Sequence, residues 1–207
     1  MTQGKGGRYH HGDLRAALID TAVELIAEQG VRNFSLAEAS RRLGVSVSAP
    51  YAHFSDRDEL LAAVAVEAYE LFYAELLPEL SQFQTPADRL AAVARAYVRF
   101  AGAHRALFEM LFEAGLDKSR HPELEAAERP IEDAFSSCVR ALPDPSETAS
   151  EELATAIEAT AHGYAMLLLD GGFGQGNEAV ELAAERAARA SLALVESRPL
   201  LGRPSVG

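Results

Sequence analysis

Residues 34–60 read FSLAEASRRLGVSVSAPYAHFSDRDEL, and this stretch decides the fold of the N-terminal part of the chain. Ser35 and Glu38 have the spacing of a capping box, in which the serine accepts a backbone N–H and the glutamate reaches back. Gly44 ends the helix that they begin after about two turns. A third short helix then opens at Ser46 and ends near Phe54. Two short helices joined by a glycine-containing turn of three residues form a helix-turn-helix, the motif that places its second helix in the DNA major groove.

Pro50 is the unusual residue of this stretch, because proline breaks most helices. If Ser46 is the N-cap, Pro50 falls around the fourth helical position, where its missing N–H costs at most one hydrogen bond. We therefore expect the proline to mark how short this helix is and to stiffen it.

The rest of the chain is typical of an all-α protein. Ala, Leu and Glu dominate, and apolar residues recur at helical spacing. Thr85 and Pro86, for example, read as an N-cap followed by proline at the first helical position. Start and stop signals of this kind predict about nine helices. They span residues 13–30, 35–43, 46–54, 56–77, 86–104, 107–112, 121–142 with a step at Pro130, 144–171 and 177–197.

The change from short to long helices predicts two parts. We expect an N-terminal arm and helix-turn-helix domain over residues 1–57, a ligand-binding and dimerisation bundle over residues 58–198, and a frayed tail over residues 199–207. The apolar runs are far shorter than the roughly 20 residues of a membrane span, and the polar, glycine-rich N-terminus does not read as a signal peptide. The single Cys138 fits a reducing compartment, so a cytoplasmic location is expected.

The charge is unevenly distributed along the chain. The formal net charge is −12, but residues 1–60 hold 7 Lys and Arg against 8 Asp and Glu, while residues 61–207 hold 12 against 23. The N-terminal part is therefore far less repelled by an anion than the remainder. This asymmetry permits DNA binding without showing it.

The residues of the first stretch resemble the DNA-binding domain of the TetR family of bacterial transcriptional regulators. The resemblance extends over residues 9–65 and rests on the capped second helix, on Gly44-Val45-Ser46, on Tyr51-x-His53-Phe54, and on Arg57 followed by Glu59-Leu60-Leu61. Three positions depart from the family pattern: Ser40 stands for a usual alanine, Pro50 for a bulkier residue and Ala52 for a common basic residue.

The resemblance implies double-stranded operator DNA as a partner. Tyr51 and His53 would contact the DNA backbone, as would Arg57 and the N-terminus of the helix capped by Ser35. Small side chains would read the bases and suit thymine methyl groups and single hydrogen bonds. The base-reading set is Ser46, Val47, Ser48 and Ala49, with Pro50 adding an apolar face. His53 as a packed histidine, and Arg41 and Arg42 as a merely solvated helix face, stay open as alternatives.

The segment Tyr9-His10-His11 raises a different possibility, because adjacent histidines can bind metal. No Cys or carboxylate completes a site nearby, so we expect no metal and no cofactor. Together with Lys5 and Arg8, the segment resembles the flexible arm of some family members and could approach DNA. A disordered leader without a role is the alternative.

The second half carries no catalytic signature, such as a phosphate-binding loop or a nucleophile elbow, and we expect no enzyme activity. It is rich in aromatic, His and Met residues on inward faces, which a small-molecule site needs. The expected ligand-binding set is Phe72, Tyr97, Phe100, His104, Phe108, Phe112, His162, Tyr164 and Met166. An ordinary bundle core is the alternative, and His104 and His162 are the strongest candidates because a buried imidazole needs a partner.

The stretch EATAHGYAMLLLDG resembles the C-terminal domain of a TetR subset with a Trp-His-Gly motif, although Ala161 stands for the tryptophan. The resemblance implies a homodimer through the last two helices, 144–171 and 177–197. Small and apolar residues on these helices allow close approach. They are Ile157, Thr160, Ala161, Tyr164, Leu168, Ala183, Ala187, Ala190 and Leu194.

We therefore expect an all-α, homodimeric, DNA-binding regulator, a repressor released by an unknown small-molecule effector. Two other classes stay open. One is a ligand-binding helical bundle without DNA affinity, which the overall acidity favours. The other is an α-helical enzyme that uses His104 or His162 as a base.

Overall fold

The computed structural model describes residues 14–143 and 147–198. The N-terminal arm with its histidine pair, the expected start of the helix 144–171 at residues 144–146 and the tail at 199–207 lie outside the described residues. The described residues form helices and connecting turns and contain no β-strand, so the all-α prediction is confirmed. None of their helices is long and apolar enough to span a membrane.

Eight α-helices and three short 3₁₀-helices follow one another in the described residues. The α-helices are α1 (Leu14–Gln29), α2 (Leu36–Leu43), α3 (Arg57–Ser81), α4 (Pro86–Ala103), α5 (Arg105–Glu113), α6 (Pro122–Arg140), α7 (Glu147–Leu169) and α8 (Asn177–Ser197). The 3₁₀-helices are η1 (Val31–Asn33), η2 (Ala49–Ala52) and η3 (Lys118–Arg120). The expected third helix is thus the 3₁₀-helix η2, and α6 continues through Pro130 to Arg140.

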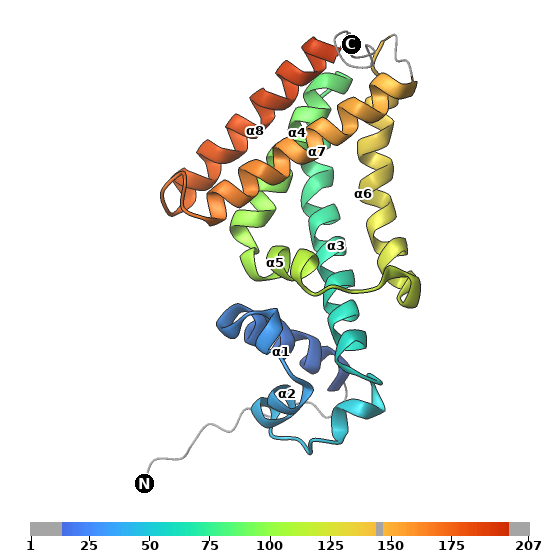
Figure 1. Ribbon diagram of the computed structural model, residues 1–207, viewed down its shortest axis with the longest axis vertical. Coiled ribbons are helices and arrows are strands. Elements are labelled where there is room, and N and C mark those ends of the chain that lie inside the picture. Colours follow the sequence, from blue (N-terminus) through green and yellow to red (C-terminus); the bar gives the residue numbers. More distant parts are fainter. Residues whose placement is uncertain (1–13, 144–146, 199–207) are drawn as a thin grey trace, which may run out of the picture.

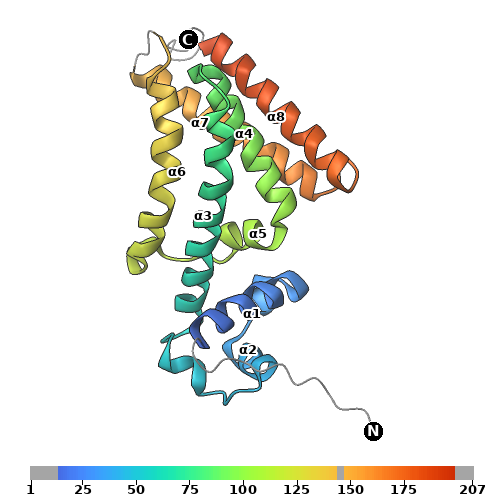
Figure 2. The ribbon, with the colours of Figure 1, turned by 180° about the vertical axis from the view of Figure 1, so that it is seen from behind.

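The helix α3 runs from the N-terminal helices into the bundle of α4 to α8 (Figures 1 and 2), and two hydrophobic cores, a lower and an upper one, include residues of it. The lower core holds α1, α2 and the first turns of α3, including Leu60 and Leu61. The upper core includes Phe72 and Leu76 from the second half of α3. The domain boundary expected between residues 57 and 58 coincides with the start of α3. The α3 residues up to Ala65 belong to the lower core, and those from Ala68 onward belong to the upper core.

The lower core is not built from N-terminal residues alone. Met110 of α5 and Leu124 of α6 are buried in it, with 0% and 2% of their surface exposed. Arg120 also approaches Asp56, the N-cap of α3, at 3.7 Å. The two helices that flank the loop 114–121 therefore reach directly into the helix-turn-helix region.

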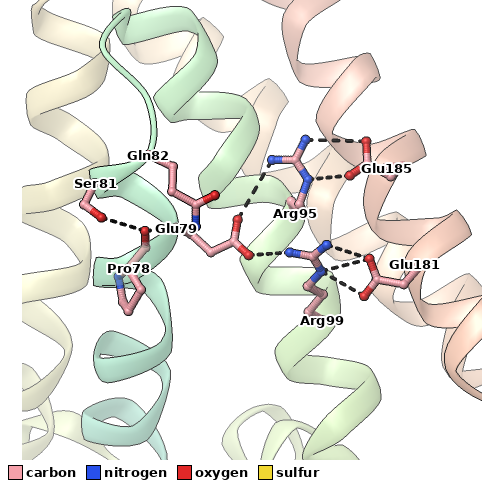
Figure 3. Close-up of polar contacts among 8 residues, drawn as sticks. All are labelled: Pro78, Glu79, Ser81, Gln82, Arg95, Arg99, Glu181 and Glu185. Atoms are coloured by element: carbon pink, nitrogen blue, oxygen red, sulfur yellow. Dashed lines mark hydrogen bonds and ion pairs between the residues drawn. The ribbon is translucent and has the colours of Figure 1, made fainter.

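Pro78 lies inside α3 instead of ending it, which the sequence did not suggest. The helix continues to Ser81, and the carbonyl of Pro78 accepts hydrogen bonds from Ser81 Oγ at 2.8 Å and from Gln82 Nε2 at 3.2 Å (Figure 3). The neighbouring Glu79 forms an ion pair with Arg99 of α4. These contacts stabilise the last turn of α3, which forms although Pro78 has no N–H to donate to the carbonyl of Ala74.

An ion-pair ladder joins α3, α4 and α8 on one side of the upper core (Figure 3). Arg99 pairs with both Glu79 and Glu181, and Arg95 donates from Nε to Glu185 at 2.6 Å. Below the ladder, Gly102 allows α4 and α8 to approach closely, since a Cβ there would lie 2.7 Å from Val180 Cγ2.

The residues expected to pair two chains lie largely inside one chain. Five of the nine are buried in the upper core, where α7 and α8 pack against α4. They are Ile157, Ala161, Leu168, Ala183 and Ala187. These five side chains are covered within the protomer and are not available to a second chain, whereas pairing of two chains through these helices stays a prediction.

Candidate nucleic-acid interface and effector site

Ser35 begins α2 as expected. Its backbone is extended, and its Oγ accepts a hydrogen bond from the N–H of Glu38 at 3.2 Å. The Glu38 carboxylate pairs with Arg41. Ser40, the departure from the usual alanine, is buried, and its hydroxyl donates to the carbonyl of Leu36 at 2.9 Å. The serine therefore fits the core without an unsatisfied polar group.

Gly44 ends α2 in the left-handed conformation, with φ of 70° and ψ of 26°. Its N–H donates to the carbonyl of Arg41, and the N–H of Val45 donates to the carbonyl of Ser40 at 3.1 Å. This is a Schellman-type end, for which glycine is favoured because its φ is positive. It turns the chain sharply into the segment that follows.

The segment 46–53, which we call the reading turn, is a tight turn leading into η2. The N–H of Ala49 donates to the carbonyl of Ser46 at 3.0 Å, and that of Tyr51 to the carbonyl of Ser48 at 3.3 Å. Pro50 has no N–H with which to make the α-helical bond to Ser46, so the tighter 3₁₀ pattern results. The N-cap is Ser48 and not Ser46, and Pro50 takes the second position of the element.

Most side chains of the reading turn face solvent. Val47 and Tyr51 are 54% and 55% exposed. Ser46, Ser48 and His53 are exposed too, and Ala49 is half-buried. Pro50, in contrast, is buried, so its expected role as a contact face is wrong and it shapes the turn instead.

Phe54 fixes the end of the reading turn in the lower core. Its ring is 2% exposed, and the guanidinium of Arg15 lies 5.3 Å from its centroid. A deeply anchored aromatic residue directly after the exposed segment holds the turn in one position relative to α1 and α3. His53 is exposed next to this anchor, so it is not the packed histidine of the alternative interpretation.

The arginines of this region have partners within the chain. Arg57 donates to the carbonyls of Val31 at 2.6 Å and of Phe34 at 3.1 Å, which ties the start of α3 to the connection before α2. Arg42 forms two hydrogen bonds with Glu28 of α1, at 2.7 and 2.5 Å. Only Arg41 has an exposed, one-turn ion pair, of the kind that contributes little to stability. The guanidinium groups of Arg42 and Arg57 therefore connect elements of the fold to one another. The guanidinium group of Arg41 is exposed and can reach a phosphate.

In the upper core, six of the nine expected ligand-binding residues form a continuous set of rings. Phe72 contacts Phe100 and Tyr97, with centroids 5.1 and 6.0 Å apart. Tyr97 contacts Phe108 at 5.4 Å. Phe108 and Phe112 both contact the ring of His162, at 5.8 and 4.8 Å. These residues come from α3, α4, α5 and α7. We call the set the ring cluster, and its members are Phe72, Tyr97, Phe100, Phe108, Phe112 and His162.

The ring cluster contains one polar contact. Tyr97 Oη lies 3.0 Å from His162 Nδ1. Burial, together with the nearby Tyr69 and Glu158, raises the pKa of the Tyr97 phenol, so it keeps its proton. A neutral phenol can donate to Nδ1 or accept from Nδ1–H, so the two side chains share one hydrogen bond whose direction follows the tautomer of the His162 ring.

The other three expected ligand-binding residues take no part in this contact, although the ring of His104 adjoins the ring cluster at Phe100. His104, at the break between α4 and α5, packs against Phe100 with ring centroids 4.9 Å apart, and its Nε2 lies 2.8 Å from Glu75 Oε1. Tyr164 contacts Phe173. Met166 is 40% exposed on the outer face of α7. Glu75 could not have been chosen from the sequence, because no spacing rule links it to a histidine 29 residues away.

Among the described residues, no group of three or more His, Cys, Asp or Glu side chains is arranged to hold a metal ion. Cys138 is buried in the upper core.

Two family models match the chain. Residues 18–64 match the model for bacterial regulatory proteins of the tetR family. Residues 90–191 match the model for the tetracyclin repressor-like C-terminal domain. The first match includes all of α2, the reading turn and the start of α3, and the second includes most of the upper core. No match was found among curated proteins.

Solved structures share the fold over nearly their whole length. A protein of unknown function from Rhodococcus sp. RHA1 is 29% identical, with a TM-score of 0.73 over 90% of this chain and 97% of that one. A tetR-family regulatory protein from Rhodococcus RHA1 is 19% identical, with a TM-score of 0.69 over 87% and 96%. RolR, solved with the ligand resorcinol, is 23% identical, with a TM-score of 0.58 over 92% and 93%.

Proposed function

The chain belongs to the TetR family of bacterial transcriptional regulators, and from this premise we propose that it is a dimeric repressor that reads its operator with residues 46–53. A small-molecule effector bound at the ring cluster would release it from DNA. The exposure of the reading turn carries the proposal. Val47 and Tyr51 are large apolar groups held in water on a turn whose two ends are fixed by Gly44 and Phe54.

The chemistry of the reading turn suits a DNA groove. Ser46 Oγ and Ser48 Oγ lie 3.1 Å apart and can each donate or accept one hydrogen bond. Val47 and Ala49 offer methyl groups to thymine. Tyr51 and His53 can donate to phosphate oxygens, and the capped N-terminus at Ser35 can approach a third. We leave Pro50 and Arg57 out of the contact set, since the first is buried and the second is engaged by Val31 and Phe34.

We further propose that two chains associate through the outer faces of α7 and α8. Gly163, in the middle of α7, has open space where a Cβ would lie, with no atom within 4 Å. Leu167 is 53% exposed one turn further along, and Leu182 of α8 is 42% exposed. An open helical glycine beside exposed leucines suits close packing against a second copy. Such a dimer would place two reading turns on half-sites about one helical turn of DNA apart.

The effector is proposed to act through the link between the two cores. Phe108 of the ring cluster and Met110 of the lower core are two residues apart on α5. A ligand that moves Phe108 would therefore disturb residues packed around the reading turn. The fold has a precedent for a small ligand, since RolR was solved with resorcinol. By linkage, DNA and effector must weaken each other's binding by the same factor.

We also propose that the chain belongs to the TetR subset with the Trp-His-Gly motif. His162 and Gly163 both have the roles described above, at the ring cluster and on the open face of α7. Ala161, at the position of the tryptophan, is buried in the upper core. We also propose that the chain is a regulator and not an enzyme.

A ligand-binding bundle without DNA affinity is the second candidate. The observation in its favour is that Arg42 and Arg57 are held internally, on a chain with a net charge of −12. Binding to DNA from upstream of the protein's own gene, measured at two salt concentrations, separates the candidates. A repressor binds with a sequence preference and loses affinity as salt rises, whereas the second candidate binds neither operator nor competitor DNA.

A further inference from the structure

Val47 occupies a corner of the reading turn. The N–H of Ala49 donates to the carbonyl of Ser46 at 3.0 Å, so Val47 and Ser48 are the two central residues of a tight four-residue turn. Val47 is 54% exposed, whereas Ala49 is half-buried and Pro50 is buried. A valine side chain has few rotamers, so its methyl groups hold one position once the backbone is fixed. The turn therefore presents a stiff aliphatic group to whatever binds it.

The polar groups of the reading turn distinguish bases poorly. Residues 46–53 contain no Arg, Lys, Asn or Gln, the side chains that make bidentate bonds to guanine or adenine. Ser46 Oγ and Ser48 Oγ lie 3.1 Å apart, and either hydroxyl can be the donor of the bond between them. The pair keeps one O–H for an outside acceptor and can also accept a bond from an outside donor. It therefore suits O4 of thymine and N4 of cytosine equally, and does not separate the two pyrimidines.

Four arginines around the reading turn do not add a base reader to it. Arg42 and Arg57 are bound within the fold, to a carboxylate and to backbone carbonyls. The guanidinium of Arg15 lies over an aromatic ring of the lower core. Arg41 lies on α2, before the turn, and pairs with a glutamate of the same helix. Among the described residues of the turn, the methyl groups of Val47 are therefore the feature that discriminates between bases most directly.

We propose that Val47 reads the C5-methyl group of a pyrimidine in the major groove, and that this contact accepts 5-methylcytosine as well as thymine. The two bases carry the same methyl group at the same ring position, whereas uracil and unmethylated cytosine lack it. Cytosine methylation at the contacted position therefore strengthens operator binding. This inference rests on the proposed function, because it concerns the bases that the reading turn selects.

Four versions of one duplex test the methyl contact. An operator is selected from a random DNA pool with the full-length protein, and the thymine whose replacement by uracil weakens binding most is identified. That position is then built as thymine, uracil, cytosine or 5-methylcytosine, each with its complementary base, and fluorescence anisotropy measures the four affinities. Each comparison is made within a pair, thymine with uracil and 5-methylcytosine with cytosine, so that the base on the other strand stays the same.

The methyl group should strengthen binding about fourfold per half-site in both pairs, as burial of one methyl group predicts. A methyl effect in neither pair, or in the thymine pair alone, would overturn the inference. A selected half-site without a constant thymine would overturn it as well.

Val47→Ala assigns the contact to this side chain. The variant should reduce the methyl effect from about fourfold to less than about twofold in both pairs, because it removes the two methyl groups of the valine. Tyr51→Phe is the matched control, since it removes a phosphate donor of the same turn. It should weaken all four duplexes by one common factor and leave the methyl effect unchanged. A methyl effect that persists in full in Val47→Ala would belong to another residue and contradict the inference.

The same affinities separate this inference from the proposed function. If the wild type selects an operator but binds all four duplexes equally, sequence-specific DNA binding stands and the methyl contact fails. If no sequence is selected from the pool, the proposed function fails and this inference fails with it.

Discussion

Arg57 Nη2 donates to the carbonyl oxygen of Val31 at 2.6 Å, across 26 positions of the sequence. This bond, with the one from Nε to Phe34, fixes the first turn of α3 to the connection between α1 and α2. The reading turn lies between these two anchored segments. Arg57 therefore positions the reading turn and does not need a DNA phosphate to satisfy its donors.

Arg57→Ala should destabilise the N-terminal region by about 1–3 kcal/mol, because two carbonyls lose a charged donor. Chemical denaturation followed by circular dichroism measures this loss. Arg41→Ala is the matched control and should change stability by less than about 0.5 kcal/mol, since its ion pair is exposed. If Arg57→Ala were as stable as the control and lost only DNA affinity, Arg57 would be a phosphate contact after all.

Pro50→Ala should leave the fold intact and change which operator sequences are preferred. The new N–H can bond to the carbonyl of Ser46, so the 3₁₀ pattern can relax towards an α-helical turn and rotate Val47 and Tyr51. Selection of bound sequences from a random DNA pool, for the variant and the wild type, shows the change. Identical selected sequences would mean that the proline does not control what the turn reads.

Two glycines distinguish the dimer surface from the protomer core. Gly163→Arg should give a folded monomer, because the side chain enters open space in the protomer but fills the proposed interface. Gly102→Val should lower the melting temperature, because its Cβ would lie 2.7 Å from Val180 Cγ2 at the crossing of α4 and α8. Sedimentation velocity and thermal unfolding measure both effects. A dimeric Gly163→Arg protein would place the interface elsewhere.

The phenol of Tyr97 should lose its proton at a higher pH than the phenol of an ordinary tyrosine. Burial raises its pKa above the usual 10.0, and burial with Glu128 does the same for Tyr69. Because the pKa of the phenol is higher in the folded than in the unfolded state, its contribution to the free energy of unfolding is complete below pH 10. That contribution is lost as the pH rises through the folded-state pKa. With no Trp in the chain, absorbance at alkaline pH reports tyrosinate directly. Tyr97→Phe should remove part of the late-titrating absorbance, and no change would contradict the neutral phenol assigned to the His162 contact.

Local signals in the sequence predicted local structure well. Ser35 and Thr85 cap α2 and α4 as expected, with backbone N–H groups bound to their hydroxyls, and Gly44 ends α2 with a positive φ. Each of these features depends on three or four neighbouring residues, so a sequence pattern can reveal it. The short element at Pro50 was correctly placed, although it is a 3₁₀-helix.

Features that depend on distant residues could not be predicted. Pro78 reads as the end of a helix, but α3 continues to Ser81, and Glu79 in this last turn pairs with Arg99 of α4. The small residues of α7 and α8 suggested a dimer surface, although nothing in the spacing showed that five of the nine side chains would be covered within the protomer. Similarly, six of the expected ligand-binding residues meet in the ring cluster, but the bond between Tyr97 and His162 depends on how α4 and α7 cross.

The most direct test of the central claim is the affinity of the protein for DNA from upstream of its own gene. Fluorescence anisotropy is measured at two salt concentrations for the wild type, for Tyr51→Ala in the reading turn, and for Leu77→Ala, an exposed control at the other end of α3. We predict salt-sensitive, sequence-preferring binding by the wild type and the control, and a loss of roughly tenfold for Tyr51→Ala. Binding that is absent in the wild type, or unchanged in Tyr51→Ala, would contradict the account.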